Sequence, residues 1–177
     1  MRRSGFGISV DVPTGWSATM VRRVVDGAEA ADPGGRGTGE RATGPTERTM
    51  PVVHVSSRPL PAAIGDFGSG LVEVMAPDDV FVALVEYGSD LAGTGLFERR
   101  GWPRLAPSQF SPARMQRALP GRSASQHFFS VGERAFCLYT VIGSHGRRMA
   151  TVPRAAGVVR SLAVERAPVL RRRGVVV

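Results

Sequence analysis

The residues of this chain that could carry out chemistry are few and widely spaced. They are His54, His127, His145, Cys137, Asp66, Asp78, Asp79 and Glu86. Histidines that bind a metal usually lie three or four residues apart on a helix or beside paired cysteines, and none of these three does. Asp78 and Asp79 could bind a cation where a strand begins, but paired aspartates in that position are more typical of a turn. We therefore expect no metal and no cofactor.

A hydrolytic site would require a base and a nucleophile that meet in the folded chain. His54 and His127 both lie in segments typical of strands, so they could meet across a sheet, with Asp78 or Glu86 nearby. The chain has no Gly-x-Ser-x-Gly nucleophile turn. A strand histidine that makes one structural hydrogen bond is the simpler interpretation. We predict a protein without catalytic activity, and keep a hydrolase that uses His54 and His127 as the lesser alternative.

The only cysteine indicates a protein that does not depend on disulfides. Cys137 lies in an apolar run and is expected to be buried and unreactive. No stretch approaches the roughly 18 apolar residues that a membrane span requires, and no apolar signal segment follows Met1-Arg2-Arg3. The expected location is therefore the cytoplasm, with no transmembrane segment.

The high positive charge is concentrated at the two ends of the chain. The formal net charge is +8 and the isoelectric point is near 11.3. Six of the 23 basic residues, all arginines, lie in residues 2–3 and 166–173, so that residues 4–165 carry a net charge of only +2. The terminal arginines predict, at most, weak and salt-sensitive attraction to a polyanion such as nucleic acid or an anionic surface. Polyanion binding through these termini is the alternative function.

A protein-binding surface is the function that we expect first, and residues 89–123 are its candidate location. This connection is too long for a simple loop and carries large apolar side chains among Gly, Pro and Arg. It either covers one face of a sheet or forms an apolar patch flanked by arginines, the mixture that interface hot spots favour. The predicted partner-binding residues are Arg99, Arg100, Trp102, Arg104, Phe97 and Phe110.

The elements that must position these residues centre on one strand. Residues 80–87 are nearly all apolar, rich in β-branched side chains, and bounded by Pro77-Asp78-Asp79 and Gly88. This composition and length indicate a strand that is buried on both faces. Other elements must then cover both sides of the sheet.

Five further strand segments, two of them in one clear hairpin, follow from alternation and turn residues. Residues 6–12 alternate apolar and polar side chains and are expected to form a hairpin with residues 16–25. Residues 51–58 form the next strand. Residues 126–131 and 134–143, joined by Gly132-Glu133, form the clearest hairpin.

Three helices are expected. Asp66 resembles an N-cap for a middle helix over residues 66–75, which Pro77 must end. A short helix over residues 111–119 would be capped by Ser111. The C-terminal helix lies between residues 148 and 165 and, because of Pro153, is expected to begin near Val152.

These elements predict one α+β domain over residues 4–165, with a mainly antiparallel sheet of five to six strands and a middle and a C-terminal helix packed on it. Residues 26–48 contain no apolar side chain larger than Ala and are expected to be a flexible loop inside the domain. Residues 166–177 are expected to be a basic tail.

The opening segment resembles a known fold family. Residues 6–16, with Val12-Pro13-Thr14-Gly15-Trp16 at their end, are similar to the strand-Pro-x-Gly-Trp start of the PsbP-like α/β/α sandwich, which actinobacterial LpqN-type proteins share. The order of strands, hairpin and C-terminal helix is similar too. The resemblance implies a binding or assembly factor without an enzymatic site. The chain departs from the LpqN pattern because it lacks a lipoprotein signal.

Overall fold

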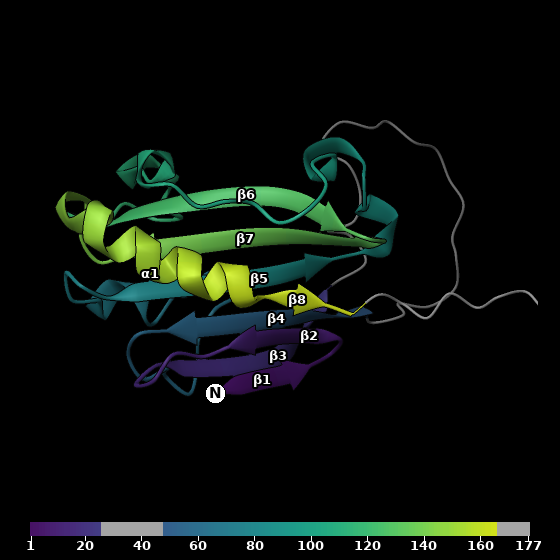
Figure 1. Cartoon of the computed structure of the whole chain (residues 1–177), viewed down its shortest axis with the longest axis horizontal. Coiled ribbons are helices and arrows are strands. Elements are labelled where there is room, and N and C mark those ends of the chain that lie inside the picture. Colours follow the sequence, from purple (N-terminus) through teal and green to yellow (C-terminus); the bar gives the residue numbers. More distant parts are fainter. Residues whose placement is uncertain (26–47, 166–177) are drawn as a thin grey trace, which may run out of the picture.

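The computed structural model describes residues 1–25 and 48–165, which form an α+β protein with two antiparallel sheets and one α-helix (Figure 1). The strands of the large sheet, in spatial order, are β3 (Ser17–Val25), β4 (Arg48–Ser56), β5 (Val80–Tyr87), β7 (Arg134–Ile142) and β6 (Ser123–Val131). The strands of the small sheet are β1 (Arg2–Gly5), β2 (Ile8–Asp11) and β8 (Ala163–Val164). The helix is α1 (Arg148–Ser161).

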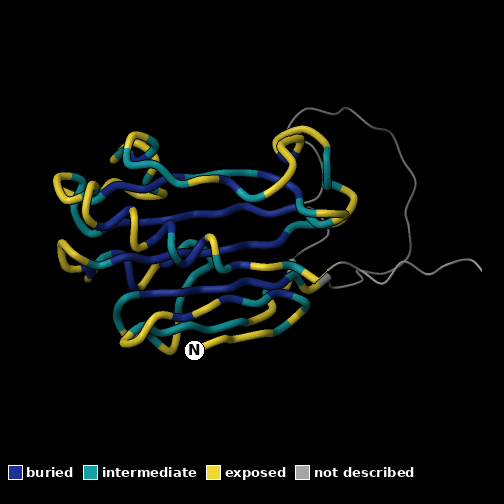
Figure 2. Tube along the Cα trace, viewed as in Figure 1, coloured by how far each residue is buried: buried dark blue, intermediate teal, exposed yellow. Residues whose placement is uncertain are grey.

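Strand β5 is the centre of the large sheet, as the sequence predicts. It pairs with β4 on one side and β7 on the other, and its first seven residues are buried. Figure 2 shows this buried band running through the middle of the molecule. Both faces of β5 must therefore be covered, and the two covers differ.

One face, which we call the helix face, is covered by α1 and the small sheet. Val82 and Leu84 of β5 pack there in one apolar cluster with Val152 and Ala155 of α1 and with Val10 of β2. The C-terminal helix is confirmed, but it begins at Arg148, before Val152, and ends at Ser161. Pro153 lies inside this helix and has no N–H to donate to the Met149 carbonyl, four residues earlier. Met149 is exposed.

The opposite face, which we call the far face, is covered by irregular chain. Leu71 and Met75 pack there on Phe81 and Tyr139. The predicted middle helix is wrong, because only a single 3₁₀ turn, Val72–Val74, forms in residues 66–75.

Glycine geometry explains the missing middle helix. Gly68 and Gly70 have φ of +87° and +90°, outside the right-handed helical region. A Cβ atom on Gly68 would lie 2.4 Å from the Phe81 ring, so this position also needs a residue without a side chain.

The short helix predicted over residues 111–119 is also wrong. One 3₁₀ turn, Pro112–Arg114, forms there, although the Ser111 hydroxyl does accept a hydrogen bond from the Ala113 N–H at 3.2 Å. Met115 and Leu119 beyond it pack on the far face as partly buried side chains.

The first predicted hairpin joins the wrong strands. Strand β2 pairs with β1 and β8 in the small sheet, whereas β3 pairs with β4 in the large one. The turn that follows β2 carries the chain from one sheet to the other, and the Trp16 N–H donates to the Pro13 carbonyl at 3.1 Å within it. The two sheets meet through Arg134, which binds Glu86 with two nitrogens and the Gly7 carbonyl with a third.

The hairpin of β6 and β7 is confirmed, with Val131 opposite Arg134 and a two-residue loop between them. The predicted flexible loop over residues 26–48 lies outside the described residues apart from Arg48, which begins β4. The predicted tail, residues 166–177, lies outside them as well. Within the described part of the chain no helix is long and apolar enough to cross a membrane.

Candidate partner-binding groove

The segment 89–123 begins its path at the edge of the large sheet, where Ser130 of β6 anchors it. The Gly93 N–H donates to the Ser130 hydroxyl, and this hydroxyl donates to the Phe97 carbonyl, both at 2.8 Å. The Ser130 N–H then donates to the Arg99 carbonyl at 2.7 Å, and the Gly101 N–H to the Ser130 carbonyl at 2.8 Å. Residues 93–101 are therefore fixed along β6 by one buried serine.

The segment places its aromatic residues on both faces of the sheet. Phe97 is 6% exposed, and its ring lies 5.2 Å from that of Tyr87 and 5.5 Å from that of Phe128, which belong to the far face. Trp102 lies on the helix face, with its ring 5.3 Å from that of Phe129. The segment thus passes around the sheet edge between Phe97 and Trp102.

The second half of the segment returns to β6. Phe110 is 3% exposed and belongs to the helix-face core. Ser111 and Ala124 then exchange two backbone hydrogen bonds, at 3.0 and 3.1 Å. The segment is therefore a cover that is bonded to β6 at both ends, which is the first of the two structures that its sequence allows.

A groove remains between this cover and α1, and we call it the Trp102 groove. It has a volume of about 490 Å³. Its lining consists of Trp102, Pro103, Arg104 and Leu105 from the cover and Ala156, Val159 and Arg160 from α1. Arg104 and Arg160 are exposed, while Ala156 and Val159 are buried. The groove has an apolar floor and two cations at its rim.

The six residues predicted to bind a partner do not form one surface. Trp102 and Arg104 line the groove, whereas the buried Phe97 and Phe110 serve the core on different faces. The exposed Arg99 and Arg100 lie on the sheet edge, where Arg100 is bridged to β6.

Sequence reasoning missed the contribution of α1 to the groove. The sequence places Ala156, Val159 and Arg160 in a helix that is expected to pack on the sheet. The small side chain of Ala156 is the signal that could have indicated a hollow beside that helix.

The two histidines do not come together. His54 is level with Ala83 and Tyr139 and points to the far face, whereas His127 is level with Leu138 on the helix face. Two strands, β5 and β7, separate them. The arrangement that the hydrolase alternative needs is therefore not formed.

Burial disfavours the charged form of both His54 and His127. Burial lowers the pKa of His54, although the hydrogen bond of its Nε2 with the Asp66 carbonyl, 3.0 Å long, acts in the opposite direction. Burial, and then the positive charges of Arg99 and Arg114, lower the pKa of His127. Among the described residues no group of three or more His, Cys, Asp or Glu side chains could hold a metal.

Cys137 and Glu86 belong to the interior of the structure. Cys137 is buried, as predicted, and burial raises the pKa of its thiol to about 11. Glu86 is paired with Arg134. Neither group is placed to act as a nucleophile or a base at the Trp102 groove.

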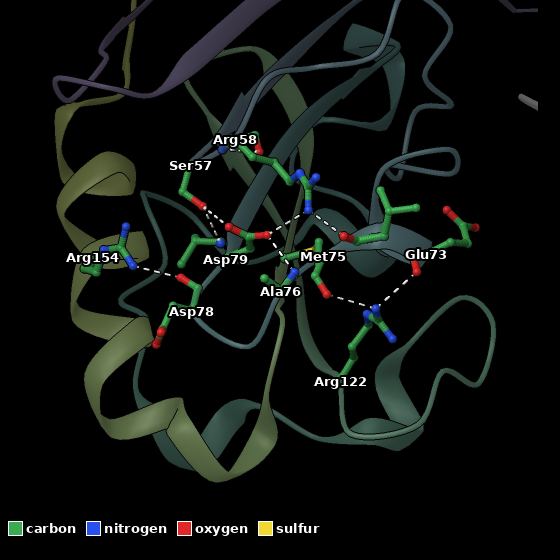
Figure 3. A network of polar contacts seen from close by, with 12 residues as sticks. Ser57, Arg58, Glu73, Met75, Ala76, Asp78, Asp79, Arg122 and Arg154 are labelled. Carbon is green, nitrogen blue, oxygen red and sulfur yellow. Dashed lines mark hydrogen bonds and ion pairs between the residues drawn. The ribbon is translucent and has the colours of Figure 1, made fainter.

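Asp79 holds a turn together (Figure 3). Its carboxylate accepts hydrogen bonds from the Ala76 N–H at 2.7 Å, the Arg58 guanidinium at 3.1 Å and the Ser57 hydroxyl at 3.2 Å. Arg122 reinforces the same region by donating to the Met75 carbonyl at 2.9 Å. The Asp79 oxygens are thus occupied in shaping the start of β5.

Comparison with known proteins adds no family to this description. A scan against protein-family models found no match, and neither did searches of curated proteins and of solved structures.

Proposed function

We propose that this protein is a non-catalytic, cytoplasmic binding module that engages another protein at the Trp102 groove. The observation that carries the proposal is the combination of an apolar floor, with Trp102, Leu105 and Val159, and two exposed arginines at its rim. Tryptophan and arginine around a concave apolar site are typical of the few residues that dominate binding energy at interfaces.

The groove also defines the chemistry of its partner. An apolar floor would take one large apolar side chain, and Arg104 and Arg160 would pair with carboxylates beside it. The partner segment is therefore acidic and carries an apolar anchor. The two cations lie at the rim of the groove and are exposed. Reversing their charge should therefore act mainly on the association rate and its salt dependence, and less on the dissociation rate.

Photo-crosslinking in the native cell tests the site directly. A photoreactive amino acid at position 104 or 160 should trap one partner protein. The matched control is position 149, on the same helix, where Met149 is 70% exposed and does not line the groove. The double variant R104E/R160E, with the photoreactive group at position 103, should lose the adduct. Adducts that form equally from position 149, or that survive the double charge reversal, would contradict this assignment.

The resemblance to PsbP-like proteins supports the same kind of function, because it implies binding and assembly rather than catalysis. The likeness of fold itself stays a prediction. The Pro13-Thr14-Gly15-Trp16 part of the motif lies in the turn between β2 and β3, and within the described residues no α-helix covers the far face. The alternative of polyanion binding through the Arg-rich termini also stays a prediction: Arg2 and Arg3 are exposed residues of β1, and the C-terminal arginines lie in residues 166–177, outside the described range.

A further inference from the structure

Strand β3 forms an open edge of the large sheet. It is nine residues long, Ser17–Val25, and within the described residues only β4 pairs with it. It lies near the lower margin of the sheet in Figure 1, at the opposite end from β6. A strand of this length presents a row of N–H and C=O groups that can bond another strand, and proteins usually shorten, charge or cover such an edge.

The side chains at this edge are apolar and accessible. Val21 and Val24 are 43% and 56% exposed, although valine is usually buried. A groove of about 800 Å³ runs beside Val21 on the far face, between β3 and Leu60 and Ile64. The edge therefore offers both main-chain bonds and apolar area to an added strand.

The two arginines of β3 are already engaged within the protein. Arg23 forms an ion pair with Asp66 at 3.3 Å. Arg22 lies over the Phe6 ring, 4.9 Å from its centre, and donates to the Thr49 hydroxyl at 3.2 Å. The edge thus carries no acidic group, and both of its arginines are held by contacts within the protein, Arg23 by an ion pair and Arg22 by uncharged partners.

We propose that a second copy of this chain pairs antiparallel with β3, about a two-fold axis at Val21. Val21 is the central residue of the strand, so it would face itself, and Val24 would face Ala18. In this register Arg22 faces Met20 and Arg23 faces Thr19, which keeps like charges from facing each other across the axis. The dimer leaves the Trp102 groove open, since that groove lies beside β6 and α1, and it does not depend on the proposed function.

Single cysteines test this register. The native chain gives little background, because Cys137 is its only cysteine and is buried. Facing residues of antiparallel strands have Cα atoms about 4.5–5.5 Å apart, within the range of about 4.4–6.8 Å that a disulfide allows. The variant V21C should therefore form a covalent dimer on mild oxidation. In V24C the two cysteines would be six residues out of register, about 20 Å apart, and no cross-link is expected.

Two further measurements complete the experiment. A mixture of A18C and V24C should cross-link, since these positions face each other. The unmodified chain should sediment at twice its 18.8 kDa mass at about 100 µM. V21K should sediment as a monomer, and V74K, changed at an exposed valine outside β3, should remain dimeric. A monomeric unmodified chain at that concentration, or equal cross-linking of V21C and V24C, would overturn the proposal. If a peptide or another part of this chain binds along β3 instead, the unmodified chain would sediment as a monomer.

Discussion

Replacing Trp102 with alanine separates the structural role of the 89–123 cover from its role in binding. One side of the indole packs on the sheet, with ring centroids 5.3 Å from Phe129 and 6.3 Å from Phe136. The other side lines the Trp102 groove. W102A should therefore lower the stability of the fold and also weaken partner binding, whereas a residue at the rim alone should affect only binding.

The size of the stability loss follows from the partial burial of Trp102. Aromatic side chains bury about 150–250 Å² when enclosed, so that a partly exposed indole removes about 120 Å² from water. At about 25 cal/mol per Å² this area is worth about 3 kcal/mol. The groove is open, so the substitution leaves no closed cavity with an additional penalty. In a domain of this size such a loss lowers the melting temperature by about 6–12 °C.

Urea unfolding followed by circular dichroism measures this loss, because the signal does not depend on the tryptophan that is removed. R104A is the matched control: Arg104 lines the same groove but is exposed, so its unfolding midpoint should stay close to that of the native chain. If W102A and R104A have the same midpoint, residues 102–105 do not stabilise the sheet and the reasoning fails.

Three other predictions follow from the core and the turns. The free energy of unfolding should fall as the pH drops below about 6.5, because burial lowers the pKa of His54 in the folded protein and the unfolded chain then binds the proton more readily. Urea titrations at several pH values should show a smaller fall for H54Q than for the native chain. Equal falls in the two proteins would contradict this. G143A should lower the free energy of unfolding by about 2 kcal/mol or more, since its Cβ would lie 1.8 Å from the Ala76 carbonyl oxygen. G157A, in an open helical position, should raise it by up to about 1 kcal/mol. Thermal melts that rank the two variants in the reverse order would refute the close contact at Gly143. R134M should cost about 3 kcal/mol by leaving Glu86 unpaired and largely buried, and R134M/E86L should recover part of that loss in the same assay.

The parts of the fold that the sequence predicts correctly are those in which neighbours along the chain determine the structure. The strand Val80–Tyr87 has the residues predicted, because a short run of β-branched side chains bounded by turn residues has few other structures available. The hairpin of β6 and β7 has the predicted loop, because a two-residue turn fixes the register of the strands beside it.

The errors arise where distant parts of the chain decide the structure. Alternation identified β2 and β3 as strands but carries no information about partners. Strand β2 pairs with β1 just before it and with β8 near the other end of the described chain, and β3 pairs with β4. The N-cap residue and the apolar spacing of residues 66–75 predict a helix from local sequence alone. They do not reveal that Gly68 packs directly on the Phe81 ring, with no room for a side chain.

The candidate site was predicted only in part for the same reason. Trp102 and Arg104 were recognisable from their composition, but the groove also needs Arg160, which lies 56 residues beyond Arg104 and reaches it only through the packing of α1. Phe97 and Phe110 resemble interface residues in sequence, and burial assigns them to the core.

The attachment of the cover to β6 limits how large an assembly can become. Backbone bridges at Arg100 with Ser130 and at Ser111 with Ala124 tie the cover to the outer side of β6 near its two ends, whereas within the described residues no strand pairs with the outer side of β3. A sheet with two free edges can grow without end, as in a fibre, because each added copy presents a new edge. Here the addition of one copy would use the free edge of both partners, so that growth through this sheet would terminate at two.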